Sequence, residues 1–195
     1  MLKDLLKDYT IILASGSPRR QKFFNDLDLD FTIDVREVQE IYPDHLEKEE
    51  ISNYLAELKA TVFTDLKPND ILITSDTIVW HKNRALGKPK TLDEAKDMIA
   101  SLSNDTHKVI TSVCFKTTNQ IKVIYDTTKV TFKELTKEEI EYYVNTYQPL
   151  DKAGAYGIQE WIGFIGISSI EGSYFNVMGL PTHLVYETLT TLAKS

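Results

Sequence analysis

The pattern of apolar and polar positions along this chain alternates between two periods. Residues 10–14 and 71–80 are apolar runs of the length expected for buried strands, and residues 47–66 place apolar side chains at helical spacing. Further strands are predicted at 31–35 and, as a pair broken at 117–120, over 108–132; further helices are predicted from Pro18, from 91 to about 103, from 136 to about 146, and from 181 to 192. This alternation predicts a mixed α/β fold.

Three helix starts carry a local signal. Thr91 is followed three residues later by Glu94, and Thr136 by Glu139, which is the spacing of a capping box. Pro18 occupies the first position of an earlier helix, where a missing N–H does no harm. We therefore expect helices to begin at these positions.

Residues 151–181 show neither period and hold six of the eight glycines of the chain. Glycine tolerates backbone angles that other residues avoid, so this segment is predicted to be irregular. A tighter turn is expected at Lys82 and Asn83, which lead into a short return segment that ends at 86–89.

The chain has 195 residues, of which 42% are hydrophobic and 26% charged, and it contains no repeat or linker-like tract. This length can bury a sizeable core. We therefore expect one domain over residues 1–195, with two lobes around a cleft as a further option.

Charge and cysteine content exclude several classes of protein. A net charge of −7 disfavours binding along a nucleic-acid backbone, which depends on many Lys and Arg contacts, but a small anionic ligand needs only a local cluster of cations. Cys114 is the only cysteine, so the chain cannot form an internal disulfide. No apolar stretch reaches the length of a membrane span. We predict a cytoplasmic protein with no membrane or nucleic-acid partner.

The first candidate for chemistry is the junction between the first strand and its helix. Ser15, Ser17, Arg19 and Arg20 place hydroxyls and two guanidinium groups at a helix N-terminus, where unpaired N–H groups favour anions. One interpretation is a phosphate cradle. The alternative is that Ser17 only caps the helix while both arginines lie in solvent.

Asp76 is the second candidate, because it lies inside an apolar strand. A buried acid is unfavourable unless it is paired, binds a metal or serves as a base. The alternative is an Asp at the end of a strand, bonded to nearby backbone. Glu40 could be a second oxygen ligand for Mg²⁺ beside Asp76, since that ion combines one or two carboxylates with phosphates and water.

Lys59, on the predicted helix over 47–66, and Lys88, in the loop after the Asp76 strand, could supply cations to the same cleft. Either lysine alone is weak evidence, because a surface lysine whose stem lies on apolar groups is the usual case. The segment 151–159, DKAGAYGIQ, suits a loop that closes on a flat base, with one donor and one acceptor on the Gln159 amide. A purely structural turn fits that composition equally well.

Taken in order along the chain, these blocks resemble the Maf family of nucleotide pyrophosphatases. The resemblance is carried by LASGSPRR at 13–20, LKA at 58–60, SDT at 75–77, LGKP at 86–89, THKV at 106–109, GSY at 172–174 and VMGLP at 177–181. The block DKAGAYGIQ resembles the branch that acts on dTTP and UTP. Departures from the family pattern occur at 147–149, where Gly-Glu-Pro is more usual, and at Asn104 and Glu160, where Gly is more usual.

The resemblance implies a fold and a homodimer. The fold is a mixed, elongated β-sheet flanked by helices around a central cleft, as in inosine-triphosphate pyrophosphatases. It also implies roles for ten residues. Asp76 is the proton acceptor; Lys88, Lys59 and Arg20 neutralise the triphosphate; Arg19, Thr77 and Gln159 set the base preference; Ser15, Ser17 and Glu40 complete the phosphate and metal environment.

We therefore predict hydrolysis of dTTP and UTP, and of modified pyrimidine triphosphates as an option, to the monophosphate and pyrophosphate. A divalent ion, Mg²⁺ or Mn²⁺, is the expected cofactor. Two alternatives are the branch of the family that acts on 7-methyl-GTP and a non-catalytic regulator of septum formation or cell division. Retention of Asp76, Arg19 and Lys88 argues against pure regulation.

Overall fold

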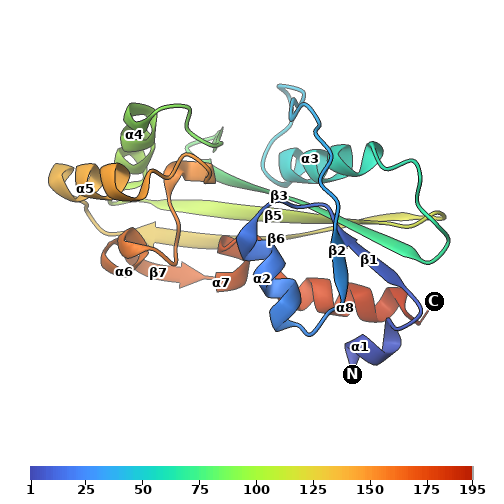
Figure 1. Cartoon of the computed structure of the whole chain (residues 1–195). Coiled ribbons are helices and arrows are strands. Elements are labelled where there is room, and N and C mark those ends of the chain that lie inside the picture. The colour runs from blue at the N-terminus through green and yellow to red at the C-terminus, as the bar shows by residue number, and fades with distance from the viewer. Residues whose placement is uncertain (195) are drawn as a thin grey trace. The chain divides into compact units, whose positions relative to one another are not determined.

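The computed structural model describes residues 1–194 and has a mixed α/β fold, as predicted (Figure 1). One seven-stranded sheet has the order β2-β1-β3-β5-β6-β7, with β4 paired to β3. The chain divides into two compact units. The first unit comprises Met1–Asp76, Thr111–Asp126 and the C-terminal segment from Gly179; the second comprises Thr77–Ile110 and Thr127–Met178.

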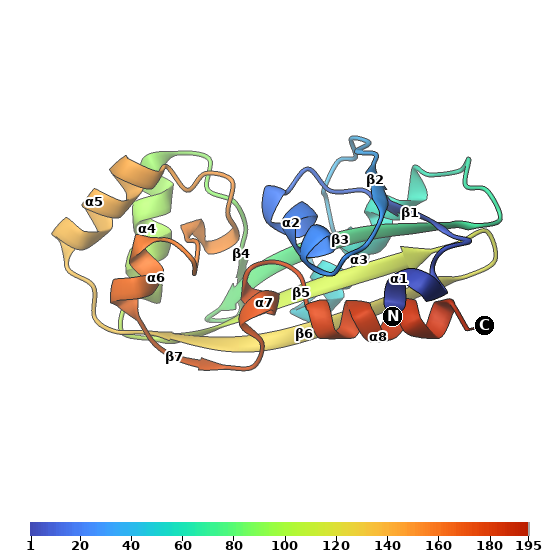
Figure 2. The same ribbon diagram turned by 60° about the horizontal axis from the view of Figure 1, so that its bottom comes forward.

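The first unit is built on parallel strands. β1 (Thr10–Leu13) pairs in parallel with β2 (Phe31–Ile33) and with β3 (Asp70–His81). Helices α2 (Pro18–Asp26) and α3 (Glu49–Thr61) make the connections from β1 to β2 and from β2 to β3. Helix α3 lies on the opposite face of the sheet from α8 (Thr182–Leu192), and the short α1 (Leu2–Leu5) contacts α8 (Figures 1 and 2).

The core of the first unit beneath α3 is small and fully apolar. Ala56, Ala60 and Phe63 pack against Leu72 of β3 and Cys114 of β5 (Thr106–Lys116). Burial in this core raises the pKa of Cys114 to about 12, so the thiol stays protonated at neutral pH. Cys114 is therefore a packing residue.

The second unit contains strands β4 and β7, the adjoining parts of β3, β5 and β6, and several helices around one core. β4 (Arg84–Leu86) pairs antiparallel with β3, and β7 (Ile167–Glu171) pairs antiparallel with β6 (Ile121–Phe132). Helices α4 (Leu92–Leu102), α5 (Lys137–Tyr147) and α6 (Trp161–Gly166) surround a core that includes Ile99, Phe132 and Tyr143. A single 3₁₀ turn, η1, spans Ala153–Ala155, and α7 spans Tyr174–Val177.

The predicted local signals are confirmed. The Thr91 hydroxyl accepts the Glu94 N–H at 3.1 Å, and Thr136 and Glu139 form a complete capping box. Lys82 and Asn83 both have positive φ, 47° and 59°, which is the geometry of a two-residue hairpin turn. None of the helices within residues 1–194 is long and apolar enough to cross a membrane.

Two predictions need correction. The helix predicted over 47–66 ends at Thr61, because Phe63 turns into the core and cations from other segments bind the last carbonyls. The segment 151–181 is not irregular throughout, since it contains α6, β7 and α7. Its glycines partly reflect close packing: a Cβ on Gly163 would lie 1.9 Å from the Ile158 carbonyl oxygen.

Candidate active site

Asp76 lies within β3, which continues to His81, so the interpretation of Asp76 as a strand-end residue is wrong. Its side chain is 10% exposed, and Lys59 Nζ donates to Asp76 Oδ1 at 2.6 Å. Lys59 reaches it from the last turn of α3. A carboxylate at this depth is tolerated because a cation pairs with it directly.

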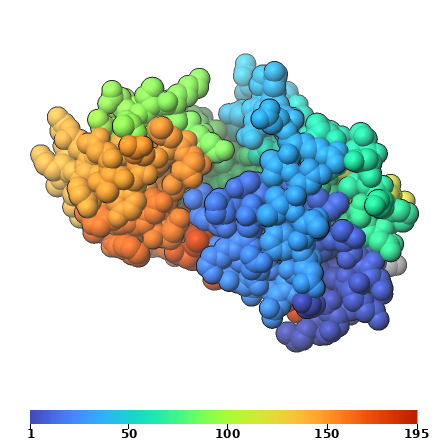
Figure 3. All heavy atoms as spheres, viewed as in Figure 1, coloured from blue at the N-terminus to red at the C-terminus, as the bar shows by residue number. Residues whose placement is uncertain are grey.

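The same ammonium also pairs with Glu40. Lys59 Nζ lies 3.3 Å from Glu40 Oε1, and the Glu40 side chain is 46% exposed. Glu40 belongs to the segment between β2 and α3, which forms part of the surface in light blue in Figure 3. Three residues predicted from the sequence, Glu40, Lys59 and Asp76, therefore form one charged cluster in the first unit.

At the start of α2, Ser17 is the N-cap residue, yet its side chain makes no capping hydrogen bond. The Ser17 N–H instead donates to the Ser15 hydroxyl at 3.3 Å, and Ser15 is buried. The interpretation of Ser17 as a simple side-chain cap is therefore wrong. A helix N-terminus of this kind has N–H groups available for an anion.

The alternative interpretation of this motif places both arginines in solvent. Arg20 does not lie there. Its Nε donates to the Gly179 carbonyl at 2.8 Å, and a terminal nitrogen donates to the Ser75 carbonyl at 3.0 Å. Burial lowers the pKa of Arg20, while the charge of Asp76 opposes that shift. Arg20 is thus a fixed positive charge beside the strand residue that precedes Asp76. Arg19 is half-buried in the same helical turn.

The other three predicted site residues belong to the second unit. Thr77 follows Asp76 on β3 and is half-buried, and Lys88 is exposed in the loop after β4. Gln159 is half-buried. Among residues 1–194, neither the Lys88 ammonium nor the Gln159 amide has a polar partner. Both side chains can therefore bind a ligand without first breaking a contact, and their convergence with the Asp76 cluster stays a prediction.

The loop that carries Gln159 is held by a buried polar network that the sequence did not reveal. Lys152 is 8% exposed and pairs with Asp151 at 2.7 Å and with Glu160 at 3.2 Å. The Tyr143 hydroxyl donates to Glu160 and accepts the Gly157 N–H at 3.1 Å. Burial and the bond to Glu160 raise the pKa of Tyr143. Glu160 completes this network. Its departure from the family pattern is the only feature of the sequence that marks the network.

Two further contacts fix the same loop within the second unit. The Gly154 N–H donates to the Gly87 carbonyl at 3.0 Å, which ties the loop to the residue before Lys88. Gly154 has a φ of 69°, and a Cβ there would lie 2.8 Å from the Val79 side chain. Only glycine fits this crossing without rearrangement. The Gln159 loop and the Lys88 loop are therefore joined.

His107 supports the loop from the sheet. Its Nε2 forms a hydrogen bond of 2.7 Å with the Tyr156 hydroxyl; the His107 ring stacks on Phe132, and the Tyr156 ring packs edge-on against Phe132. Burial lowers the pKa of His107 to about 3, so the ring is neutral at physiological pH. His107 therefore acts in the loop's support, and it is not a general base.

These features define an α/β protein in which a buried acid is paired with a lysine and an arginine at a helix start is fixed to backbone carbonyls. The family model for Maf-like proteins matches residues 10–192, and the chain belongs to the Maf family.

The chain is similar over nearly its full length to proteins named dTTP/UTP pyrophosphatase. It is 64% identical to the one from Flavobacterium johnsoniae, over 98% of this chain and 100% of that protein. It is 61% identical to the one from Christiangramia forsetii, over the whole of both chains, and 49% identical to one from Bacteroides fragilis, over 96% and 98%. The Staphylococcus aureus Ham1 structure covers 94% of this chain and 99% of its own, with a TM-score of 0.51 and 15% identity, which shows a shared fold.

Proposed function

We propose that this protein hydrolyses nucleoside triphosphates, dTTP and UTP among them, to the monophosphate and pyrophosphate, with Asp76 as the base. The observation that carries the proposal is the buried Asp76 carboxylate, held at 2.6 Å by Lys59 with Glu40 on the other side of the ammonium. Family membership and the names of the relatives support the same activity.

In the proposed reaction, the oxygen of one water forms a bond to one phosphorus of the α–β bridge, and the bond from that phosphorus to the bridging oxygen breaks. One water proton passes to Asp76, and the monophosphate and pyrophosphate are released. Arg20, Lys59 and Lys88 neutralise charge on the phosphate oxygens, and the N–H groups at the start of α2, beside Ser15 and Ser17, bind one phosphate. A positioned base of this kind contributes about 10² to 10⁴ in rate.

The Asp76 cluster fits a divalent ion such as Mg²⁺ or Mn²⁺. The Lys59 ammonium already pairs with oxygens of both Glu40 and Asp76, so these two carboxylates are close enough to share a cation. No group of three or more His, Cys, Asp or Glu side chains in residues 1–194 could hold a metal by itself. Glu40 and Asp76 would therefore share the ion with phosphate oxygens, as Mg²⁺ sites commonly do. The ion supplies charge neutralisation and orientation of the phosphates.

Base preference is assigned to Arg19, Thr77 and Gln159. The Gln159 amide offers one donor and one acceptor to the edge of a pyrimidine, and the network around Lys152 and Glu160 fixes its loop. A polar contact of this kind rejects a mismatched base more strongly than an apolar wall does. A homodimer and a cytoplasmic location are further parts of the proposal and stay predictions.

The test is pyrophosphate release from a panel of nucleotides by the purified full chain. We expect dTTP and UTP to be cleaved in the presence of Mg²⁺ or Mn²⁺, and cleavage to stop on chelation. Modified pyrimidine triphosphates and 7-methyl-GTP belong in the same panel. Faster cleavage of 7-methyl-GTP would assign the chain to the other branch, and no cleavage of any nucleotide would support the regulatory alternative.

A further inference from the structure

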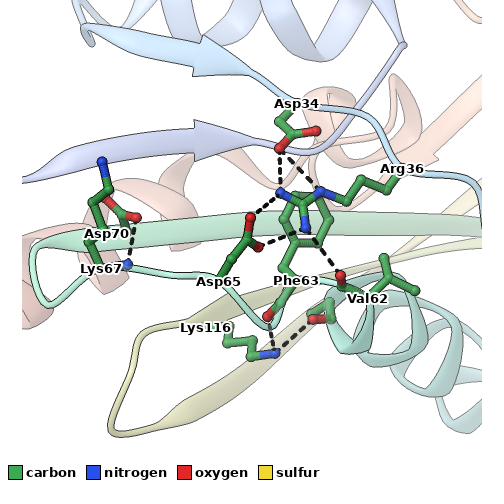
Figure 4. A network of polar contacts seen from close by, with 9 residues as sticks. Asp34, Arg36, Val62, Phe63, Asp65, Lys67, Asp70 and Lys116 are labelled. Carbon is green, nitrogen blue, oxygen red and sulfur yellow. Dashed lines mark hydrogen bonds and ion pairs between the residues drawn. The ribbon is translucent and has the colours of Figure 1, made fainter.

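Arg36 lies four positions before Glu40, outside every predicted motif, and makes an unusually complete set of contacts (Figure 4). Its two terminal nitrogens donate to the two Asp65 oxygens at 2.7 and 3.0 Å. Its Nε and one terminal nitrogen donate to Asp34 Oδ2 at 3.2 and 2.9 Å. The guanidinium also donates to the Val62 carbonyl at 3.2 Å and lies 4.2 Å from the centre of the Phe63 ring.

These contacts are not best explained as a source of stability. The Arg36 side chain is 32% exposed and Asp65 is 64% exposed, and ion pairs at this exposure contribute little to the free energy of unfolding. What the contacts fix is geometry. Arg36 fastens its own segment to Asp34, at the end of β2, and to Val62, at the C-terminus of α3.

A second cation holds the same helix end from β5. Lys116 Nζ donates to the Ala60 carbonyl at 2.9 Å and to the Phe63 carbonyl at 2.8 Å (Figure 4). The last carbonyls of a helix have no partner within the helix, so side chains that bind them define where it ends. Arg36 and Lys116 together therefore fix the turn of α3 that carries Lys59.

Arg36 thus joins the two segments whose side chains meet at Asp76. Glu40 follows Arg36 in the chain, and Lys59 precedes Val62, which Arg36 binds; Lys59 then pairs with Glu40 at 3.3 Å and with Asp76 at 2.6 Å. We propose that Arg36 is a positioning residue that sets Glu40 and Lys59 against Asp76, with Lys116 as its partner at the helix end. Its expected effect on catalysis rests on the proposed function.

The chemistry of the side chain explains why this position needs arginine. A planar guanidinium presents five N–H donors in fixed directions and stacks on an aromatic ring, whereas an ammonium is a point charge. Lysine at position 36 would have one side-chain nitrogen in place of three, so it could not reproduce the two-nitrogen contact with Asp65 or the stacking on Phe63. Arg36→Lys therefore keeps the charge and removes this fixed geometry.

The first test does not depend on activity. Lysine acylation of the full chain, followed by mass spectrometry, reports how firmly each ammonium is held. In Arg36→Met we expect Lys59 to react several-fold faster than in the unmodified sequence, while Lys22, paired with Asp26 on the surface of α2, keeps its rate. An unchanged Lys59 rate in the folded variant would overturn the proposal. If Arg36→Met does not fold, Arg36→Lys carries the same expectation.

The second test is a double-variant cycle on pyrophosphate release from dTTP. Arg36→Met should lower kcat/KM about tenfold, since small displacements of a catalytic group have effects of this size or larger. Combined with Glu40→Gln, it should lower kcat/KM by less than the product of the two single effects, because Arg36 acts through Glu40 and Lys59. Fully multiplicative effects would contradict this, and Lys22→Met is the matched control. If the unmodified protein shows no cleavage, the proposed function fails while the acylation test still decides the role of Arg36.

Discussion

The two units hold their predicted site residues in opposite ways. In the first unit, these residues already have polar partners: Lys59 pairs with both Asp76 and Glu40, and Arg20 binds backbone carbonyls. In the second unit, Lys88 and Gln159 have no polar partner within residues 1–194. The fixed polar contacts there are made by the supporting residues Lys152, Tyr143, Glu160 and His107.

This difference suggests a division of labour. A group that must accept a proton or balance charge benefits from a fixed electrostatic setting before the ligand arrives. A group that must recognise a base needs free donors and acceptors on a rigid support. The first unit has the former arrangement and the second has the latter.

The largest effect is expected at Asp76. Asp76→Asn keeps the size of the side chain but removes the proton acceptor, so turnover of dTTP should fall by about 10² to 10⁴ while the fold is retained. Steady-state pyrophosphate release and circular dichroism measure the two properties. Asp26→Asn, in an exposed pair with Lys22, is the matched control and should behave as the unmodified chain does. Full turnover in folded Asp76→Asn would show that another group accepts the proton.

In the second unit, Lys152→Met should break the support of the Gln159 loop. It leaves Glu160, which is 19% exposed, without its cation, and the loss of one partner from a buried ion pair costs about 3 kcal/mol. Urea denaturation measures the free energy of unfolding. The double variant Lys152→Met/Glu160→Gln removes both charges and should recover part of that loss. A single variant as stable as the parent would mean that the network does not support the loop.

His107 gives the second unit a dependence on pH. Its pKa falls to about 3 in the folded state, against about 6.5 in the unfolded chain, so the unfolded chain binds the proton first. Stability from this group is present above about pH 6.5 and is lost as the pH falls toward 3, by about 2 kcal/mol at pH 5.

Urea denaturation at pH 7 and pH 5 measures that loss, and His107→Gln, which cannot take up a proton, should show a smaller one. Equal losses in the two proteins would place the pH dependence elsewhere.

The smallest effect, and the most specific, is expected at Gln159. Gln159→Ala removes one donor and one acceptor from a supported loop, so the preference for dTTP and UTP over purine triphosphates should weaken about tenfold while the fold is unchanged. Ratios of kcat/KM across the nucleotides measure this. Ratios that do not move would exclude Gln159 from base selection.

The site features of the first unit could be predicted from the sequence more fully than those of the second unit. Asp76 stood out because an acid interrupts an apolar strand, and Pro18 marked the helix start beside Ser15 and Arg20; both signals are local. The support of the Gln159 loop is not local, since Tyr143 comes from α5 and His107 from β5. Only the unusual Glu160 pointed to it.

Two other features escaped prediction for physical reasons. Arg36 lies in a segment without helix or strand, and its partners are set by the fold, so no spacing marks it. The composition of 151–181 predicts glycines that form loops, whereas Gly163 lies inside α6 and allows that helix to approach Ile158. A glycine needed for close packing and one needed for a turn look alike in a sequence.

The products formed from dTTP test the proposed hydrolysis at the α–β bridge directly. The full chain is incubated with dTTP and Mg²⁺, and the nucleotides and phosphates are separated by anion exchange at several times. We predict dTMP and pyrophosphate in equal amounts from the earliest time, with no dTDP. Accumulation of dTDP with orthophosphate would show cleavage at the terminal phosphate and would exclude the proposed reaction.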